Sequence, residues 1–514
     1  MSNWAAGYVL DIPYTSGFYR ELEPDYLRFV TLANGIRPPE FGPGATYCEL
    51  ACGQGFGTAL LAAANPQARF WGFDFNPSQI ANARRLAAEA GLTNVTFEDW
   101  SFAQAVERAG DLPAFDIVVL HGIYSWISEE NRQAIVAFLD RTLKPGGLVY
   151  VSYNCMPGWA AVAPLQRLMR EHANRRPDRS DLQAAAALAF ATRMKEGGAG
   201  YFAQNAALTG RMEKLPGMNR NYLAHEYLNG HWHPLYHLDV VREMEAARLT
   251  YACSATITEN VDNVCVPGPL LPLLQETRDR GWQETVKDYV SNKQFRRDIF
   301  VRGASSLTPF DQARLVADLR FALVVPRGAV SFKFTGPLGE IQGQEEVYGP
   351  IADALAEKPR TVGELVALPP LAGRPLGAIL QALSLLLHAG HVHPMQHDAR
   401  GKIAEAAKAF NRIVARRTVR GAEGLSNLAA PAIGGGLPVT HAELLGVLAM
   451  HENPKADPAQ IATFGWATME QSGQRLMKDG KGLQTKEENL AELEAQLTMF
   501  VSAKLPIWKQ LGIV

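Results

Sequence analysis

The chain has 514 residues, of which 47% are hydrophobic and 20% are charged, and its formal net charge is -2. This length predicts roughly three domains, and the apolar content excludes a disordered chain. The small net charge gives no global attraction to nucleic acid. The chain lacks an uninterrupted apolar run of about 18 residues, so the sequence does not predict a membrane span.

The N-terminus and the cysteines both indicate the cytoplasm. Residues 1–5 lack the basic region and the apolar stretch of a secretory signal. The chain has five cysteines, an odd number without metal-ligand spacing, which is typical of a reducing compartment. We therefore expect a cytoplasmic protein without a bound metal.

The first predicted unit is a strand, a helix and a second strand. The strand at 46–51 leads into the turn Gly53-Gln54-Gly55-Phe56-Gly57, the helix covers 58–64 and the second strand covers 69–75. Glycines let a backbone turn approach a ligand closely, and Asp74 can accept hydrogen bonds from ribose hydroxyls. The order of these elements predicts a Rossmann-like cofactor site, whereas the glycine spacing alone would also suit an ordinary turn.

Glu49 indicates which cofactor this turn holds. A dinucleotide brings an anionic pyrophosphate and needs no acidic residue beside it. S-adenosylmethionine brings an ammonium and a sulfonium, so a carboxylate at this position favours binding. The motif is similar to the first motif of class I S-adenosylmethionine-dependent methyltransferases, although Ala51 stands where that family more often has glycine.

Further strands follow in the order that this resemblance implies. They are predicted at residues 94–97, 115–120 and 148–153. After the first of them, the family places an acidic residue and an aromatic residue against the adenine, here Asp99 and Trp100. Because the carboxyl ends of parallel strands share one edge, Asp74, Asp99, His121 and Asn154 are expected together at the active site.

The resemblance implies an α/β fold with a Rossmann-like, seven-stranded methyltransferase sheet. Its last two strands would form an antiparallel hairpin, for which the sequence offers residues 249–258 and 262–267. Residues 161–238 predict a helical insertion over the carboxyl edge, serving as a lid or as a substrate-choosing element. A helical pair that mediates dimerisation is the alternative.

The insertion contains the densest group of aromatic and histidine residues, at 222–228 and 231–237. These residues do not predict a zinc site, because no cysteine is near and the pair His225-Glu226 lacks a second histidine four residues after the first. A structural cluster or a pocket wall is favoured. Aromatic groups beside carboxylates suit a cationic amine through cation-π attraction.

The rest of the chain predicts mainly helical domains. Residues 345–394 resemble a winged-helix unit with a capping box at Thr361 and Glu364, but its third helix is mostly Ala and Leu, which favours protein packing over DNA readout. Residues 429–438 are rich in Gly and Pro and predict a linker. Helices with glutamate three residues after the cap begin at Thr440 and Thr485.

Six segments are therefore expected. They are 1–160, the first part of the S-adenosylmethionine-binding domain; 161–238, the insertion; 239–268, the end of the sheet; 269–344, a regulatory or middle domain; 345–430, a winged-helix-like domain; and 431–514, C-terminal helices.

A narrower resemblance rests on the combination of residues 11–16, the glycine turn, 121–126, 152–159, 222–228 and 292–298. It is similar to bacterial methyltransferases with a methyltransferase regulatory domain, a group that includes protein-lysine methyltransferases acting on outer-membrane proteins. The resemblance spans about residues 8–320. It implies a middle domain used for dimerisation, which would make the protein a homodimer.

Methyl transfer from a sulfonium is an in-line displacement, so close contact between donor and nucleophile supplies much of the acceleration. A lysine acceptor must also lose a proton, because its pKa in solution is about 10.4. The groups expected around the acceptor are Tyr14, Tyr124, Trp126, Tyr153 and Asn154, with Glu226 holding the ammonium. His121 is expected either to accept the proton or only to shape the cofactor pocket.

The expected cofactor contacts are Glu49, Ala51, Gly53, Gly55, Asp74, Phe75, Asp99, Trp100 and His121. Glu49 would lie near the methionine amine and Asp74 on the ribose hydroxyls. The favoured activity is S-adenosylmethionine-dependent N-methylation of lysine in a protein or peptide. A small-molecule O- or N-methyltransferase is the alternative, and a regulatory binding protein without catalysis is the least favoured hypothesis.

Overall fold

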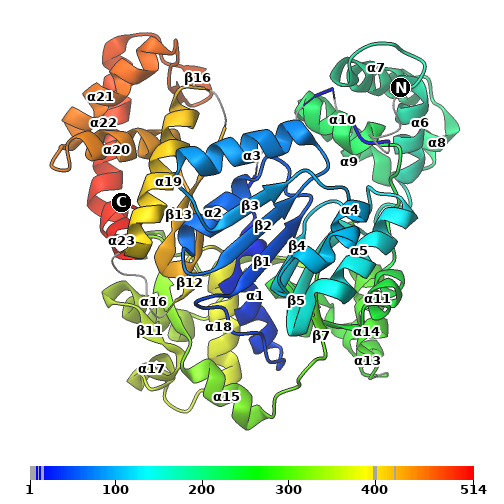
Figure 1. Cartoon of the computed structure of the whole chain (residues 1–514), viewed down its shortest axis with the longest axis horizontal. Coiled ribbons are helices and arrows are strands. Elements are labelled where there is room, and N and C mark those ends of the chain that lie inside the picture. The colour runs from blue at the N-terminus through cyan, green and yellow to red at the C-terminus, as the bar shows by residue number, and fades with distance from the viewer. Residues whose placement is uncertain (1–6, 10, 13–16, 277, 397–401, 422–423) are drawn as a thin grey trace.

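A seven-stranded mixed sheet forms the centre of the molecule (Figure 1). The computed structural model describes residues 7–9, 11–12, 17–276, 278–396, 402–421 and 424–514. In sheet order the strands are β3 (Val95–Glu98), β2 (Arg69–Phe73), β1 (Thr46–Leu50), β4 (Phe115–Leu120), β5 (Leu143–Asn154), β7 (Phe295–Arg302) and β6 (Leu249–Ser254). β1 to β5 are parallel, and β7 runs antiparallel to both of its neighbours. The predicted Rossmann-like methyltransferase sheet is confirmed.

Helices cover both faces of this sheet. They are α1 (Pro24–Ala33), α2 (Phe56–Ala64), α3 (Pro77–Glu89), α4 (Phe102–Glu107), α5 (Glu129–Thr142) and α11 (His237–Glu245). Successive strand residues point to opposite faces. Tyr47 and Tyr150 share a core with α1 and α2, whereas Val118 and Val151 share a core with α5 and α11. Both faces are apolar, which explains why the strands read as continuous hydrophobic runs.

The closing strands differ from the prediction. Residues 262–267, expected as the last strand, contain the short helix α12 (Asp262–Cys265). The partner of β6 is β7, which follows α13 (Leu271–Gln275) and α14 (Arg280–Ser291). The sequence of β7 hides its strand character, because the charged residues Arg296 and Asp298 are buried within it. The sheet therefore closes inside the segment 269–344 and not before residue 268.

Residues 161–238 form a helical lobe beside the sheet (Figure 1). Its helices are α6 (Ala163–Ala173), α7 (Ser180–Glu196), α8 (Gly200–Ala203), α9 (Ala207–Lys214) and α10 (Arg220–Leu228). Leu165, Leu188 and Tyr227 form a core with Trp126, which follows β4, and Trp159, which follows β5. These two tryptophans anchor the lobe at the carboxyl edge of the sheet.

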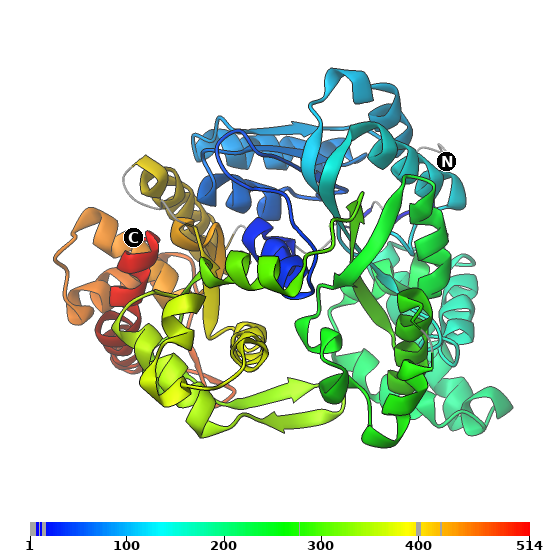
Figure 2. The same cartoon turned by 90° about the horizontal axis from the view of Figure 1, so that it is seen from below.

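The C-terminal helices lie on the other side of the sheet from the insertion (Figure 2). The elements up to residue 395 are α15 (Pro309–Ala317), β8 (Arg320–Leu323), the hairpin β9 (Lys333–Gly336) and β10 (Gly339–Gln342), α16 (Glu345–Glu357), β11 (Arg360–Thr361), α17 (Val362–Val366), α18 (Leu376–His388) and β12 (Val392–Met395). The capping box predicted at Thr361 and Glu364 is present. Ile379, Leu383 and Leu386 of α18 are buried, so its apolar residues pack in a protein core.

Residues 429–438 are not a linker. They form most of a buried hairpin, β13 (Asn427–Ala430) and β14 (Gly435–Pro438), which packs against α2. A side chain at Gly436 would lie 2.9 Å from both Leu60 and Phe18, so a larger residue there would have to displace these two side chains. Composition alone does not separate this use of glycine from flexibility.

The last helices pack on one another, and α19 packs against this hairpin. They are α19 (Lys402–Val419), α20 (His441–Glu452), α21 (Pro458–Gln471), α22 (Lys486–Met499) and α23 (Leu505–Leu511), with a small hairpin of β15 (Met477–Lys478) and β16 (Lys481–Gly482). The capping boxes predicted at Thr440 and Thr485 are both present. Each satisfies two backbone N–H groups that the first turn of a helix leaves unpaired.

Candidate active site

A cavity of ≈450 Å³ opens at the carboxyl edge of the parallel strands. Its walls come from the turn after β1, the ends of β2, β4 and β5, the start of β7, the N-terminal segment and the insertion. The predicted site residues that line it are Glu49, Ala51, Gly53, Asp74, Phe75, His121, Trp126, Asn154 and Glu226. The structure thus brings together residues that are up to 177 positions apart in the sequence, from Glu49 to Glu226.

The turn after β1 contains three residues with positive φ. Ala51, Gly53 and Gly55 have φ angles of 56°, 56° and 71°. A side chain on Gly55 would lie 2.8 Å from the ring of Phe97, so only glycine lets the turn pack on β3. Gly55 therefore supports the turn without lining the cavity, whereas Ala51 and Gly53 line it.

Two buried carboxylates face the cavity beside this turn. Glu49 accepts a hydrogen bond from the hydroxyl of Thr58, and Asp74 accepts bonds from the N–H groups of Gly53 (3.0 Å) and Asn76 (2.9 Å). Burial raises the pKa of Glu49 to about 7 and the pKa of Asp74 to about 6. A ligand with an ammonium group and hydroxyl donors would relieve this cost, and S-adenosylmethionine has both. The residues present fit this cofactor.

His121 follows β4 and forms another part of the cavity wall. Its Nδ1 lies 2.8 Å from the hydroxyl of Tyr150 and 3.2 Å from Oγ of Ser152, and its ring stacks on Tyr19 at 3.8 Å. Burial and, to a lesser degree, the charge of Arg297 lower the pKa of His121 to about 3. A histidine with this pKa is a poor proton acceptor at neutral pH. Of the two predicted roles, shaping the pocket is the one this geometry favours.

The part of the wall nearest the insertion is aromatic and has a third carboxylate. Trp126, Trp159 and Tyr222 line it together with Glu226. Burial raises the pKa of Glu226 to about 7, while Arg211 opposes this shift. Within the described chain no group donates a hydrogen bond to the Glu226 carboxylate. This carboxylate is available to a ligand.

Two predicted acceptor-site residues, Tyr124 and Tyr153, do not line the cavity. Their hydroxyls donate to Glu243 (2.5 Å) and to Asp298 (2.6 Å), and both side chains are fully buried. Strand alternation explains Tyr153, because its neighbour Asn154 lines the cavity and adjacent strand residues point to opposite faces. The expectation that the acceptor amine passes these two tyrosines is therefore corrected.

The two residues predicted to contact the adenine are not part of the cavity wall either. Asp99 has a side chain that is 44% exposed and lies 3.8 Å from Arg84. Trp100 stacks on Phe73 at 5.1 Å in the core beside the sheet. Phe102, which begins α4, lines the cavity in this region.

The cavity also contains residues that the sequence did not predict, namely Tyr8, Tyr19, Arg211 and Arg297. The two tyrosines flank the stretch 11–16, which was the only signal for this region. Tyr14, predicted within that stretch, lies outside the described residues. Arg297 lies within the stretch 292–298, where no spacing distinguishes it from its neighbour Arg296.

Neither a metal cluster nor a membrane-spanning helix is found among the described residues. No three His, Cys, Asp or Glu side chains gather there as metal ligands would. No helix in that part of the chain has both the length and the apolar content to cross a bilayer. The five cysteines are free thiols.

Two segments of the chain match known protein families. Residues 42–233 match the family described as a methyltransferase domain, which covers the cofactor turn and most of the insertion. Residues 219–302 match the predicted methyltransferase regulatory domain, which includes β6 and β7. The second match begins in the insertion and ends with the last strand of the sheet.

Some similar proteins match nearly the whole chain, and others match only a part of it. An uncharacterized protein of Synechocystis sp. is 42% identical over 511 residues, 99% of each chain. A trans-aconitate 2-methyltransferase of Methylobacterium nodulans is 33% identical over 143 residues, 28% of this chain and half of that protein. The solved structure of PKMT2 from Rickettsia typhi in complex with AdoHcy superimposes with a TM-score of 0.69 and 18% identity, covering 97% of this chain and 99% of the other. This chain belongs to the S-adenosylmethionine-dependent methyltransferases that carry a methyltransferase regulatory domain, and S-adenosylmethionine is its cofactor.

Proposed function

We propose that this methyltransferase acts on the side-chain amine of lysine in a protein or peptide. The observation that carries the proposal is Glu226, a carboxylate that lines the cavity beside aromatic residues, in a part of the wall that also contains Arg211. A carboxylate attracts an ammonium group, and the faces of Trp126 and Tyr222 attract it through cation-π interactions, whereas the Arg211 guanidinium already lies 4.3 Å from the ring centroid of Trp159. A neutral hydroxyl acceptor would gain little from this combination.

The acceptor amine must lose a proton before it reacts. Lysine has a pKa of about 10.4 in water, so nearly all of it is protonated at neutral pH. Glu226, with a pKa of about 7, suits the acceptance of that proton better than His121, with a pKa of about 3. Removal of the amine from water lowers its own pKa and makes the transfer easier.

S-adenosylmethionine supplies a methyl group on a positively charged sulfur, and its transfer requires in-line contact with the nucleophile. Glu49 would hold the amine of the cofactor's methionine part, and Asp74 would hold its ribose hydroxyls. The aromatic wall would hold the lysine nitrogen, and Glu226 would accept the amine proton.

The extent of the similarities supports a protein acceptor. PKMT2 of Rickettsia typhi, solved with AdoHcy, shares its fold with this chain from the cofactor domain to the C-terminal helices. The trans-aconitate 2-methyltransferases match about a quarter of the chain, the part that handles the cofactor. The insertion and the appended domains are therefore shared with PKMT2, and their size suits a bulky acceptor.

Mass spectrometry tests the proposal directly. The protein is incubated with S-adenosylmethionine and lysine-containing proteins, and we expect a mass gain on lysine. Glu226→Gln should reduce this gain strongly, while Glu213→Gln, a change of an exposed glutamate in the same lobe, should leave it unaffected. If no lysine in any tested protein gains a methyl group, the proposal fails.

The second candidate is a small-molecule methyltransferase. Arg211 and Arg297 also line the cavity, and guanidinium groups suit an acceptor with carboxylates. The same incubation with small amines, alcohols and carboxylic acids decides between the two. Turnover of a small acceptor, without any protein methylation, would favour this candidate.

A further inference from the structure

The β5–β7 side of the cavity presents a row of polar side chains. Ser152 and Arg297 stand opposite each other in the antiparallel register of β5 and β7, so their side chains share one face of the sheet. Asn154 lies two residues further along β5, on the same face. His121 follows β4, the next strand, and contacts Ser152 at 3.2 Å. The row ends beside β1 and its glycine turn.

Arg297 is the charged member of this row. Its guanidinium lies 5.1 Å from the ring centroid of Phe295, and its Nη1 donates to Oγ1 of Thr256 at 3.3 Å. Its Nε is buried without an acceptor, and no carboxylate in the described chain forms an ion pair with it. The neighbouring Arg296 pairs with three carboxylates. The buried, unpaired Nε of a cation indicates a ligand with negative charge.

Asn154 supplies a second donor. Its side chain is 5% exposed and lines the cavity, and its Nδ2 has no acceptor among the described residues. The position of Asn154 is fixed, because its backbone N–H donates to Oγ of Ser125 at 3.0 Å. A buried amide without an acceptor costs about 1 to 3 kcal/mol, which a ligand oxygen would recover.

His121 supplies a third donor through its tautomer. Oγ of Ser152 accepts a 2.7 Å bond from the N–H of Gly122, so its own proton is donated elsewhere. The acceptors within reach are the hydroxyl of Tyr150 and Nδ1 of His121, and these two atoms lie 2.8 Å apart. If Nδ1 of His121 carries no proton and acts as an acceptor, the hydroxyl protons of Ser152 and Tyr150 both find an acceptor. The neutral ring then carries its proton on Nε2.

The geometry points to a carboxylate-binding subsite formed by Arg297, Asn154 and His121. A carboxylate has enough lone pairs to accept bonds from a guanidinium, an amide and an imidazole together. Two carboxylates can occupy it: that of the methionine part of the cofactor, whose amine we place at Glu49, or one carried by the acceptor. The first source is independent of the proposed lysine acceptor, whereas the second rests on it.

This subsite gives the regulatory segment a direct part in binding. Arg297 lies within residues 219–302, which match the predicted methyltransferase regulatory domain. The other two donors are His121, which follows β4, and Asn154, which ends β5. Residues 219–302 therefore contribute a ligand-binding side chain, Arg297, to the proposed subsite.

Calorimetry distinguishes the two sources. The ligands are S-adenosylhomocysteine and an analogue that lacks only its carboxylate, tested on the wild type, Arg297→Gln, and the control Arg314→Gln, which changes an exposed arginine. If the cofactor supplies the carboxylate, Arg297→Gln lowers affinity for S-adenosylhomocysteine about 10- to 100-fold and leaves the analogue within about twofold. Arg297→Lys should recover part of the loss.

The second arm applies if S-adenosylhomocysteine binds Arg297→Gln as well as it binds the wild type. Two lysine peptides, one with Glu and one with Gln beside the lysine, are then bound to the protein loaded with S-adenosylhomocysteine. An acceptor source predicts that the wild type prefers the Glu peptide and that Arg297→Gln loses this preference. Unchanged affinity for both nucleosides, with no such preference, overturns the subsite; absence of lysine methylation by the wild type instead overturns the proposed function.

Discussion

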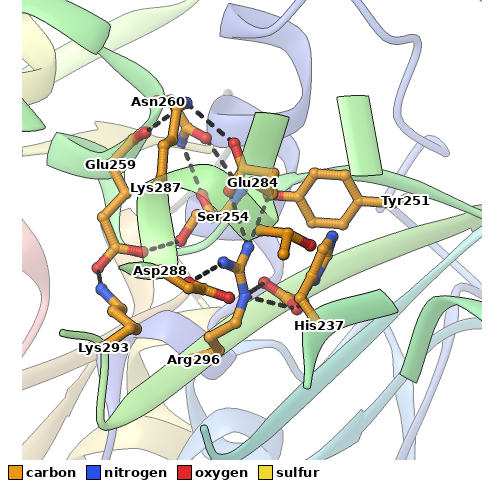
Figure 3. A network of polar contacts seen from close by, with 12 residues as sticks. His237, Tyr251, Ser254, Glu259, Asn260, Glu284, Lys287, Asp288, Lys293 and Arg296 are labelled. Atoms are coloured by element: carbon orange, nitrogen blue, oxygen red, sulfur yellow. Dashed lines mark hydrogen bonds and ion pairs between the residues drawn. The ribbon is translucent and has the colours of Figure 1, made fainter. Parts of the chain in front are cut away.

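The two faces of β5 and β7 show how one pair of strands can serve two purposes. On the cavity face, Asn154 and Arg297 keep donors that have no acceptor among the described residues. On the opposite face, Tyr153, Arg296 and Asp298 belong to a buried network of hydrogen bonds and ion pairs. Figure 3 shows the part of this network around Arg296. Because adjacent residues of a strand point to opposite faces, a shift of one position separates a ligand site from a structural centre.

The buried network is centred on Arg296, which is fully buried. Its guanidinium donates to Asp298 (3.0 Å), Asp288 (2.6 Å) and Glu284 (2.8 Å), and His237 contacts Asp298 at 3.1 Å. These contacts join β7 to α14 and to the start of α11 (Figure 3). Removal of one partner from a network of this kind would leave a buried charge unpaired, which is strongly destabilising.

The pKa of Glu284 in the network and the pKa of Glu49 in the cofactor turn are shifted in opposite directions. Burial alone would raise the pKa of Glu284, but Arg296 and Lys287 outweigh burial and lower it to about 2. Burial raises the pKa of Glu49 to about 7, and the hydrogen bond from Thr58 only partly offsets it. Cations of the protein stabilise the charged form of Glu284 in the network, whereas the charged form of Glu49 in the turn would be stabilised by a cationic ligand.

The largest expected effect comes from breaking the network. Asp298→Ala removes a partner of Arg296, His237 and Tyr153, and should lower the free energy of unfolding by about 3 to 5 kcal/mol. Urea denaturation measures this. The control Asp353→Ala, which changes an exposed carboxylate, should cost less than about 1 kcal/mol. A loss below that value for Asp298→Ala would mean that the network is not structural.

In the cofactor turn, removal of a carboxylate should stabilise the protein, whereas in the network it destabilises the protein. The pKa of Glu49 is raised on folding, so its contribution to stability is present below the ordinary pKa and is lost as the pH rises to about 7. Glu49→Gln should therefore stabilise the ligand-free protein by about 1 to 3 kcal/mol at pH 8, with little change at pH 5. Denaturation at both pH values measures this, and a less stable variant at pH 8 would contradict it.

Cofactor affinity gives a matched pair of variants. Asp74→Ala should weaken S-adenosylhomocysteine binding by about 1 to 3 kcal/mol, because a ribose hydroxyl pair loses its acceptor. Asp99→Ala should leave affinity unchanged, since Asp99 does not line the cavity. Calorimetry on both variants tests the assignment. If both variants lost the same affinity, Asp99 would contact the adenine as the sequence predicts.

The smallest effect is expected at Tyr153. Tyr153→Phe removes one hydrogen bond to Asp298 and should cost about 1 kcal/mol of stability, with kcat within about twofold of the wild type. Tyr222→Phe makes the same chemical change at a tyrosine that lines the cavity, and it provides the comparison. A large fall in kcat for Tyr153→Phe, without a loss of stability, would place Tyr153 at the acceptor after all.

The sequence predicted the features that local signals encode. The glycine turn, Glu49 and Asp74 follow from short motifs, and the order of the first five strands follows from apolar runs. The orientation of Tyr153 depends on which face of β5 meets the cavity, and no local signal states this. The strand β7 was missed because its buried charges are paired by residues of other elements, and the hairpin at 427–438 because its glycines serve packing.

The division of β7 between its two faces is tested most directly by two adjacent arginines. Arg296→Gln and Arg297→Gln make the same chemical change one residue apart, and each variant is measured for both unfolding and ligand binding. We expect Arg296→Gln to lose about 3 to 5 kcal/mol of stability and to bind normally when folded. Arg297→Gln should keep its stability within about 1 kcal/mol and lose affinity for the ligand that carries the carboxylate. The same pattern in both variants would contradict the account.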